Sequence, residues 1–204
     1  MGPAKGGSMR YLVLALCLAA GAAQAENGTD PEWPCVQRKQ PNLSLGQMWS
    51  GPEPDEAARD LARTPGIAAL ADRLEQRRLP LAEAEAEIAE FAKTADNQQL
   101  TALVVAIFDR IEPHRAALIA GIARYGHKQV DLAQRIQDHR AKMEEMQKAE
   151  APDFDAIDAE EERLDWDMRI FQDRQQALTY VCETPVILEQ RVFALARAIA
   201  AGLQ

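Results

Sequence analysis

The stretch that decides the fold covers residues 104–146 and reads VVAIFDRIEPHRAALIAGIARYGHKQVDLAQRIQDHRAKMEEM. Apolar residues recur in it every three and four positions, which is the spacing of one face of a helix. This seam consists of Val104, Phe108, Ile111, Arg115, Leu118, Ile122, Tyr125, Gln129, Leu132, Ile136, His139, Met143 and Met146. The stretch therefore predicts a long amphipathic helix that pairs with another in the manner of a coiled coil.

A second seam with the same period follows a break at Ala151-Pro152. It consists of Ile157, Glu161, Leu164, Met168, Phe171, Gln175, Leu178 and Cys182. Because the break is short, the two helices should fold back on each other. The predicted fold is all-α, a long antiparallel helical hairpin with its tip near residues 149–152.

Composition agrees with a single helical domain over residues 55–204. The chain has 204 residues, of which 47% are hydrophobic and 5% aromatic, enough for one core but too polar for a multi-pass membrane protein. Ala, Leu, Glu, Arg and Gln are helix formers, and no run of alternating β-branched residues predicts a strand.

Residues 1–25 read as a secretory signal peptide. Lys5 and Arg10 are basic, residues 11–20 are apolar, and residues 23–25 form a small-residue cleavage site. The signal is complete from Met9 as well as from Met1. The apolar run is shorter than the roughly 20 residues that cross a bilayer, so we expect no stable membrane insertion after cleavage. Together with the Ala- and Arg-rich composition, this predicts export to a bacterial periplasm.

The charge of the chain argues against nucleic acid and anionic lipid as partners. Cleavage after Ala25 removes Lys5 and Arg10 and no acidic residue, so the formal charge of −9 becomes −11. Such a protein repels polyanions. We therefore expect a protein partner, and a homodimer is compatible with the sequence.

Cleavage would also remove Cys17, leaving Cys35 and Cys182 in an oxidising compartment. Two cysteines there usually pair, so we predict an intramolecular disulfide. Two separate thiols or an intermolecular bridge are the alternatives.

Residues 26–54 are rich in Pro, Gly, Asn and Ser and show no helical period. They include Trp33 and Trp49, which a solvated linker would rarely carry. We interpret this segment as an extended strap along the helices, anchored by its aromatic residues and by Cys35.

Two shorter helices precede the hairpin. Thr64-Pro65 is a start signal for a helix that ends at Leu79, and a second helix covers residues 81–94. Both should pack at the open end of the hairpin and form a four-helix bundle. Beyond about Tyr125 no sequence remains to cover the arms, which should project as a two-helix coil.

Both long arms contain a proline, Pro113 and Pro185. For a hairpin that turns near residues 149–150, the two prolines fall at one level, where they would bend both arms together. The same register brings Arg115 near Glu183 and predicts an ion pair. Alternatively, Thr184-Pro185 could start a separate last helix.

No catalytic set of residues is present, so the sequence predicts neither an enzyme nor a bound cofactor. There is no Gly-rich phosphate loop, no nucleophile elbow, no Cys-x-x-Cys and no His-Glu-x-x-His.

His139, Met143 and Met146 share one helix face and form a candidate Cu(I) site in an exported protein. The alternative is that they fill seam positions near the turn.

An acidic segment follows the predicted tip. It surrounds the off-seam Trp166 with carboxylates, among them Asp158, Glu161, Glu162 and Asp165. Such a surface could bind a basic partner around an exposed indole, or could be a solvated face.

An exported, Ala-rich helical hairpin resembles in shape the periplasmic hairpin proteins of envelope-stress and metal-resistance systems. Those families carry Leu-Thr-x-x-Gln repeats, whereas Leu100-Thr101 and Leu178-Thr179 lack the glutamine here. No functional residue is therefore carried over. The sequence predicts a non-enzymatic accessory or scaffold protein of the envelope that acts through protein contacts, with a metal-binding or stress-sensing protein as the alternative.

Overall fold

The computed structural model describes Gly2 and residues 33–204. The predicted signal peptide, apart from Gly2, and the first residues of the strap lie outside the described part. The described residues contain helices and no strands. The fold is the all-α helical hairpin that the sequence predicts.

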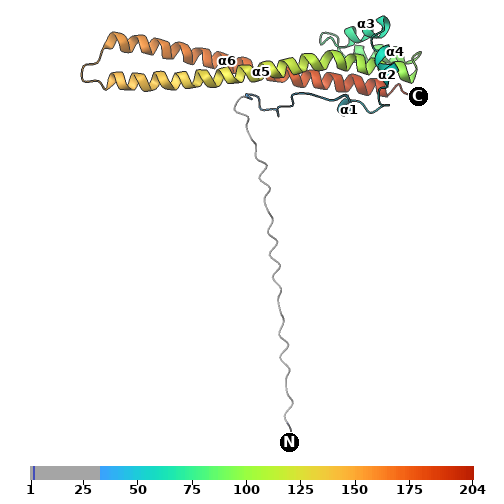
Figure 1. The fold of residues 1–204 in the computed structure, drawn as a ribbon, viewed down its shortest axis with the longest axis horizontal. Coiled ribbons are helices and arrows are strands. Elements are labelled where there is room, and N and C mark those ends of the chain that lie inside the picture. Colours follow the sequence, from blue (N-terminus) through green and yellow to red (C-terminus); the bar gives the residue numbers. More distant parts are fainter. Residues whose placement is uncertain (1, 3–32) are drawn as a thin grey trace.

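Two long antiparallel helices form the hairpin, α5 (Asn97–Gln147) and α6 (Phe154–Ala200), and they lie side by side (Figure 1). Asp96 caps α5 by accepting a hydrogen bond from the Gln99 backbone N–H, and the Gln99 side-chain oxygen accepts one from the Asp96 N–H. Asp153 caps α6 by accepting from the Ala156 N–H at 3.1 Å. Such caps satisfy backbone groups that a helix end leaves free.

Three short helices surround the open end of the hairpin. They are α2 (Glu56–Leu61), α3 (Pro65–Leu74) and α4 (Leu81–Ala92). The main core lies where α3 and α4 cover α5 and α6. Its fully buried side chains include Ala71, Leu74, Ala84, Ile88, Leu100, Leu103, Val104, Ile107, Val192, Leu195 and Ile199.

The sequence predicts that this helix ends at Leu79, but α3 ends at Leu74. The reason is a tertiary contact. The guanidinium of Arg191 on α6 donates to the Leu74 carbonyl at 2.6 and 2.9 Å and to the Leu79 carbonyl at 3.1 Å. Those bonds hold residues 75–79 as a turn, because a cation beside the last carbonyls stabilises a helix end.

The strap runs along the hairpin on the side opposite α3 (Figure 1). Leu43 and Trp49 are buried, and the Leu43 N–H donates to Glu112 on α5 at 2.8 Å. Part of the strap is helical, because Leu45–Met48 form α1, which Ser44 and Gln47 cap. The strap is therefore mostly extended, with one short helix the sequence did not predict.

Both long helices continue through their prolines, so no separate last helix begins at Pro185. The two prolines do not lie at one level. Pro185 and Ile119 line the same cavity, and Arg115 lies beside Glu189. The register differs from the predicted one because α5 extends to Gln147 and α6 begins only at Phe154, which moves the centre of the turn.

The tip half of the hairpin projects beyond the short helices and the strap (Figure 1). A small apolar cluster of Leu132, Ile136 and Leu164 joins its two helices, with Met143, Met168, Ile170 and Phe171 packed against it. Ile157 is buried in this half as well, and polar contacts of Glu160 join the same two helices.

Candidate functional site

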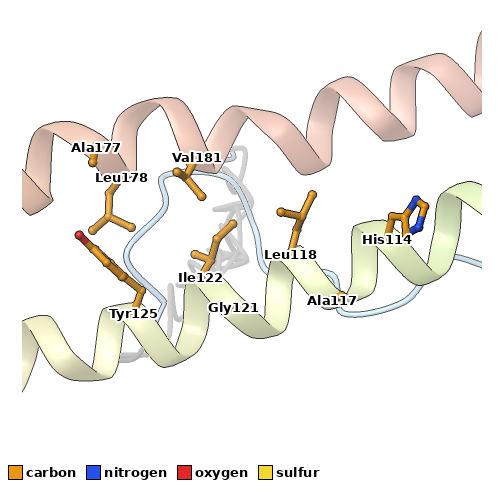
Figure 2. A pocket seen from close by; sticks show the side chains of 9 residues that line it. All are labelled: His114, Ala117, Leu118, Gly121, Ile122, Tyr125, Ala177, Leu178 and Val181. Atoms are coloured by element: carbon orange, nitrogen blue, oxygen red, sulfur yellow. The ribbon is translucent and has the colours of Figure 1, made fainter. Parts of the chain in front are cut away.

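An apolar groove lies between α5 and α6, midway along the hairpin (Figure 2). Its volume is about 570 Å³. It is lined by His114, Ala117, Leu118, Gly121, Ile122 and Tyr125 of α5 and by Ala177, Leu178 and Val181 of α6. No residue of the strap lines it, so the groove lies on a face that the strap leaves open.

Small residues create this groove. Leu118, Ile122 and Leu178 project between the helices in Figure 2, whereas Ala117 and Gly121 add little side-chain volume to the walls. A Cβ atom placed on Gly121 would meet only the guanidinium of Arg124, at 3.8 Å. The hollow is therefore a consequence of which residues face one another, since larger side chains would fill it.

The groove continues the face that α3 and α4 cover. On α5 this face carries Arg110, which donates to the Ala68 carbonyl of α3 at 3.2 Å, and His114 follows one turn later. On α6 it carries Arg191, which holds the α3–α4 turn, and the groove residue Ala177 lies two heptads earlier on the same side. The short helices α3 and α4 cover this face only as far as Arg110 and Arg191. Beyond these residues the same face of the hairpin continues uncovered as the apolar groove.

Two guanidinium groups stand at the end of the groove that is nearer the tip of the hairpin. Arg174 lies over the ring of Tyr125, 5.9 Å from its centroid, in cation–π geometry. Arg124 lies beside Gly121. The groove thus offers an apolar floor with positive charge at one end.

The opposite side of the hairpin is closed by the disulfide between Cys35 and Cys182, whose Cα atoms are 5.6 Å apart. The predicted pairing is confirmed. Ile122 is buried with the two sulfurs, and Trp33 packs against them while its Nε1–H donates to the Gln37 carbonyl at 2.6 Å. The bond therefore fixes the strap to the middle of α6.

Arg115 is buried in the hairpin, 3% exposed, and its acidic neighbours are not the predicted one. Its guanidinium lies 3.3 Å from Glu189 and 3.8 Å from Glu112, whereas Glu183 is exposed. The register shift described above moves Glu183 away and brings Glu189 into place. The ion pair exists, but with another partner on α6.

A buried carboxylate organises the projecting half. Glu160 is 1% exposed; it is hydrogen-bonded to Nδ1 of His139 and accepts from Lys142 and Arg163, each at 2.9 Å. The hydrogen bond with His139, followed by that with Lys142, lowers the pKa of Glu160 from 4.5 to about 2. Arg135 and Asp167 add a second cross-helix pair at 3.4 Å.

Of the three candidate metal ligands, His139 contacts this carboxylate. His139 binds Glu160 through Nδ1, while its Nε2 lies 3.9 Å from Asp167. Met143 packs against the apolar cluster of the tip half, and Met146 is half-buried. Within residues 33–204, no group of three or more His, Cys, Asp or Glu side chains could hold a metal ion. Metal binding by His139, Met143 and Met146 stays a prediction.

The acidic segment near the tip is open to solvent. Trp166 is 61% exposed, and Phe154 at the start of α6 is 72% exposed. The carboxylates named with Trp166 are exposed as well, namely Asp158, Glu161, Glu162 and Asp165. The arrangement is available for contact, and its use as a docking surface stays a prediction.

Sequence reasoning missed the groove. Alanine and glycine at 117, 121 and 177 are ordinary residues in an Ala-rich helix, and nothing in the pattern says that they face one another. Tyr180 and Ile187 are exposed apolar residues of α6, 14 and 21 positions after Trp166, but they lie on its outer face and do not line the groove.

Comparisons with family models, with curated proteins and with solved structures find no match to this chain. Among the described helices, none is long and apolar enough to cross a membrane. The properties of the surface itself are therefore the basis for a function.

Proposed function

We propose that this chain is an exported, non-enzymatic helical protein that works through protein–protein contacts, as an accessory or scaffold component of a bacterial envelope. The observation that carries the proposal is the groove of Figure 2, where an apolar face covered by α3 and α4 continues without cover. An exposed apolar hollow of this kind marks a contact surface.

The partner segment that fits the groove is an amphipathic helix. The groove extends from His114 to Tyr125, or about three helical turns. The intramolecular helices that cover the same face are also short and amphipathic, with Ile67, Leu74 and Ile88 facing the core. A partner helix would therefore repeat the packing already used at the open end.

Positive charge at one end of the groove should set the orientation of the bound helix. Arg124 and Arg174 stand at the end of the groove nearer the hairpin tip. Acidic residues on the partner helix should therefore lie at that end. Complementary charge of this sort fixes the orientation of a bound helix more than it raises affinity.

Export is supported by the disulfide. A bond that closes a loop over 147 positions of sequence persists in oxidising compartments and is rare in the cytosol. Together with the signal-like residues 1–25, this supports a periplasmic location.

The proposal is tested by photo-crosslinking in cells. A benzophenone amino acid replaces Ala117 in the groove or, as a control, the exposed Ala69 on α3. We expect adducts with other proteins from position 117 and none from position 69. The second variant Gly121→Leu fills the groove and should abolish those adducts. Equal adducts at both positions, or adducts that survive Gly121→Leu, would contradict the proposal.

A metal-binding protein is the second candidate, and one observation favours it. A histidine that ligates a metal usually donates its other ring N–H to a carboxylate, and His139 is bound to Glu160 in this way. Cu(I) titration of the purified protein tests this function. Saturable binding that is lost in a Met143→Leu/Met146→Leu variant would support it, and binding unchanged in that variant would exclude it.

A further inference from the structure

The outer face of α6 carries an apolar stripe that no described part of the chain covers. Trp166, Tyr180 and Ile187 are 61%, 80% and 44% exposed, and Asp173 completes a series with seven-residue spacing. These positions point away from α5, since the residues that face α5 are Leu164, Leu178 and Cys182. Single exposed apolar residues are ordinary on a protein surface, whereas these three lie on one line along α6.

Two further columns flank this stripe. One consists of Arg169, Gln176 and Glu183, and the other of Ile170, Ala177 and Thr184. Within residues 33–204, Arg169 and Glu183 take part in no hydrogen bond or ion pair with this chain. Their charges are therefore free to meet a partner.

The face is complementary to itself when the helix direction is reversed. With a two-fold axis between positions 176 and 177, Trp166 meets the partner's Ile187 and Asp173 meets the partner's Tyr180. In the flanking column Arg169 meets the partner's Glu183. Each contact occurs twice, as an isologous interface requires.

The pairs are also chemically suitable. The Tyr180 hydroxyl can donate to a carboxylate such as Asp173, and the Trp166 indole can bury its surface on the branched side chain of Ile187. Ala177 lies next to the axis, where its small side chain allows two helices to approach closely. We propose that the chain forms a homodimer through antiparallel packing of this α6 face.

The occupant is a second copy because the order of residues fits reversal of the same sequence. The face from Trp166 to Ile187 spans about 32 Å of helix, so a single helix pair makes a small interface and weak, micromolar-range association is expected. The inference rests on the proposed function, action through protein contacts, but its stripe lies on the outer face of α6 and meets the groove only at Ala177, which lines the groove as well.

Sedimentation equilibrium across roughly a hundredfold range of concentration tests the dimer. The full mature chain should dimerise, Arg169→Glu and Glu183→Arg should each weaken dimerisation by tenfold or more, and the Arg169→Glu/Glu183→Arg double variant should restore it. Exchange of charge at Arg59 and Glu56, exposed on α2, is the matched control and should change nothing.

Disulfide trapping gives a second readout. An Ala177→Cys variant should form covalent dimers on mild oxidation, because the two copies of position 177 meet at the axis. Ala120→Cys, exposed on α5, should not. The inference would be overturned if the chain stayed monomeric at every concentration. It would also be overturned if the chain dimerised but the charge reversals did not weaken the dimer and Ala177→Cys formed no covalent dimer. If the chain is monomeric but position 117 still forms adducts with other proteins, only the dimer is excluded and the proposed function stands. If neither adducts nor dimers are found, both proposals fail.

Discussion

At the scale of single residues, the projecting half depends on one buried carboxylate. Glu160 lies between the helices and is surrounded by His139, Lys142 and Arg163. A buried charge is tolerated only when it is paired and hydrogen-bonded, and three donors satisfy this one. The polar contact replaces the apolar pair that the seam would otherwise place there.

The pH dependence of stability should reveal this group. Because the pKa of Glu160 falls from 4.5 to about 2 in the folded chain, its ionised form stabilises the fold. That contribution is complete above pH 4.5 and is lost as the pH falls towards 2. Glu160→Gln should therefore lower the urea midpoint at pH 7, and its difference from the unmodified chain should shrink between pH 4.5 and 2.

Glu161→Gln is the matched control, since Glu161 is exposed beside Glu160 and should show little effect at any pH. A deficit of Glu160→Gln that stays constant down to pH 2 would show that folding does not lower the pKa of this carboxylate.

Glycines at two sites should respond oppositely to alanine. At Gly121 a new Cβ meets only the Arg124 guanidinium at 3.8 Å, so Gly121→Ala should stabilise α5 by about 0.5–1 kcal/mol through helix propensity. At Gly202 the Cβ would lie 2.8 Å from the Ala92 Cβ, so Gly202→Ala should destabilise. Urea unfolding of both variants measures the difference. Equal signs would contradict the groove geometry or the packing of the chain end.

At the scale of elements, the α3–α4 turn depends on Arg191. Burial lowers the pKa of this guanidinium, which nonetheless donates to the carbonyls of Leu74 and Leu79. Arg191→Ala leaves those carbonyls without a donor and should lower the free energy of unfolding by about 2–3 kcal/mol.

Arg191→Lys is the comparison, because lysine keeps the charge but lacks the planar guanidinium that reaches both carbonyls. This variant should recover part of the free energy of unfolding that Arg191→Ala loses. Hydrogen exchange of residues 75–80 should increase in both variants. Unchanged exchange there would contradict this role.

The strap depends on its disulfide. Reduction removes a constraint across 147 positions of sequence, which the chain-entropy model values at about 4–5 kcal/mol as an upper figure. Thermal unfolding with and without reductant should show a large loss for the native chain and none for Cys35→Ser/Cys182→Ser. If the loss is the same in the double variant, reductant acts elsewhere.

Periodicity and residue chemistry predicted the elements well where local sequence decides them. The hairpin follows from seams that repeat over many turns, and the Cys35–Cys182 bond follows from the pairing expected in an exported chain. The end of α3 and the partner of Arg115 were not predictable, because each depends on a residue far away in sequence, Arg191 or Glu189. A shift of a few residues at the turn is enough to exchange Glu183 for Glu189.

At the scale of the whole molecule, the projecting coil was predictable, but the groove was not. Once α3, α4 and the strap are assigned to the open end, no sequence remains to cover the tip half. The groove instead requires knowing that Ala117, Gly121 and Ala177 face one hollow, which is a property of register. The exposed stripe on α6 was visible in the spacing of Trp166, Tyr180 and Ile187 once α6 was known to be continuous.

Both proposed contact surfaces lie on the hairpin, and both require it to be a rod whose tip half is uncovered. Small-angle scattering of the dilute Arg169→Glu variant measures this directly. The 51 residues of α5 alone span about 76 Å, so a rod should give a radius of gyration of about 22 Å or more. A value of about 16–17 Å, that of a compact chain of this length, would mean that the arms fold against the open end and would contradict the account.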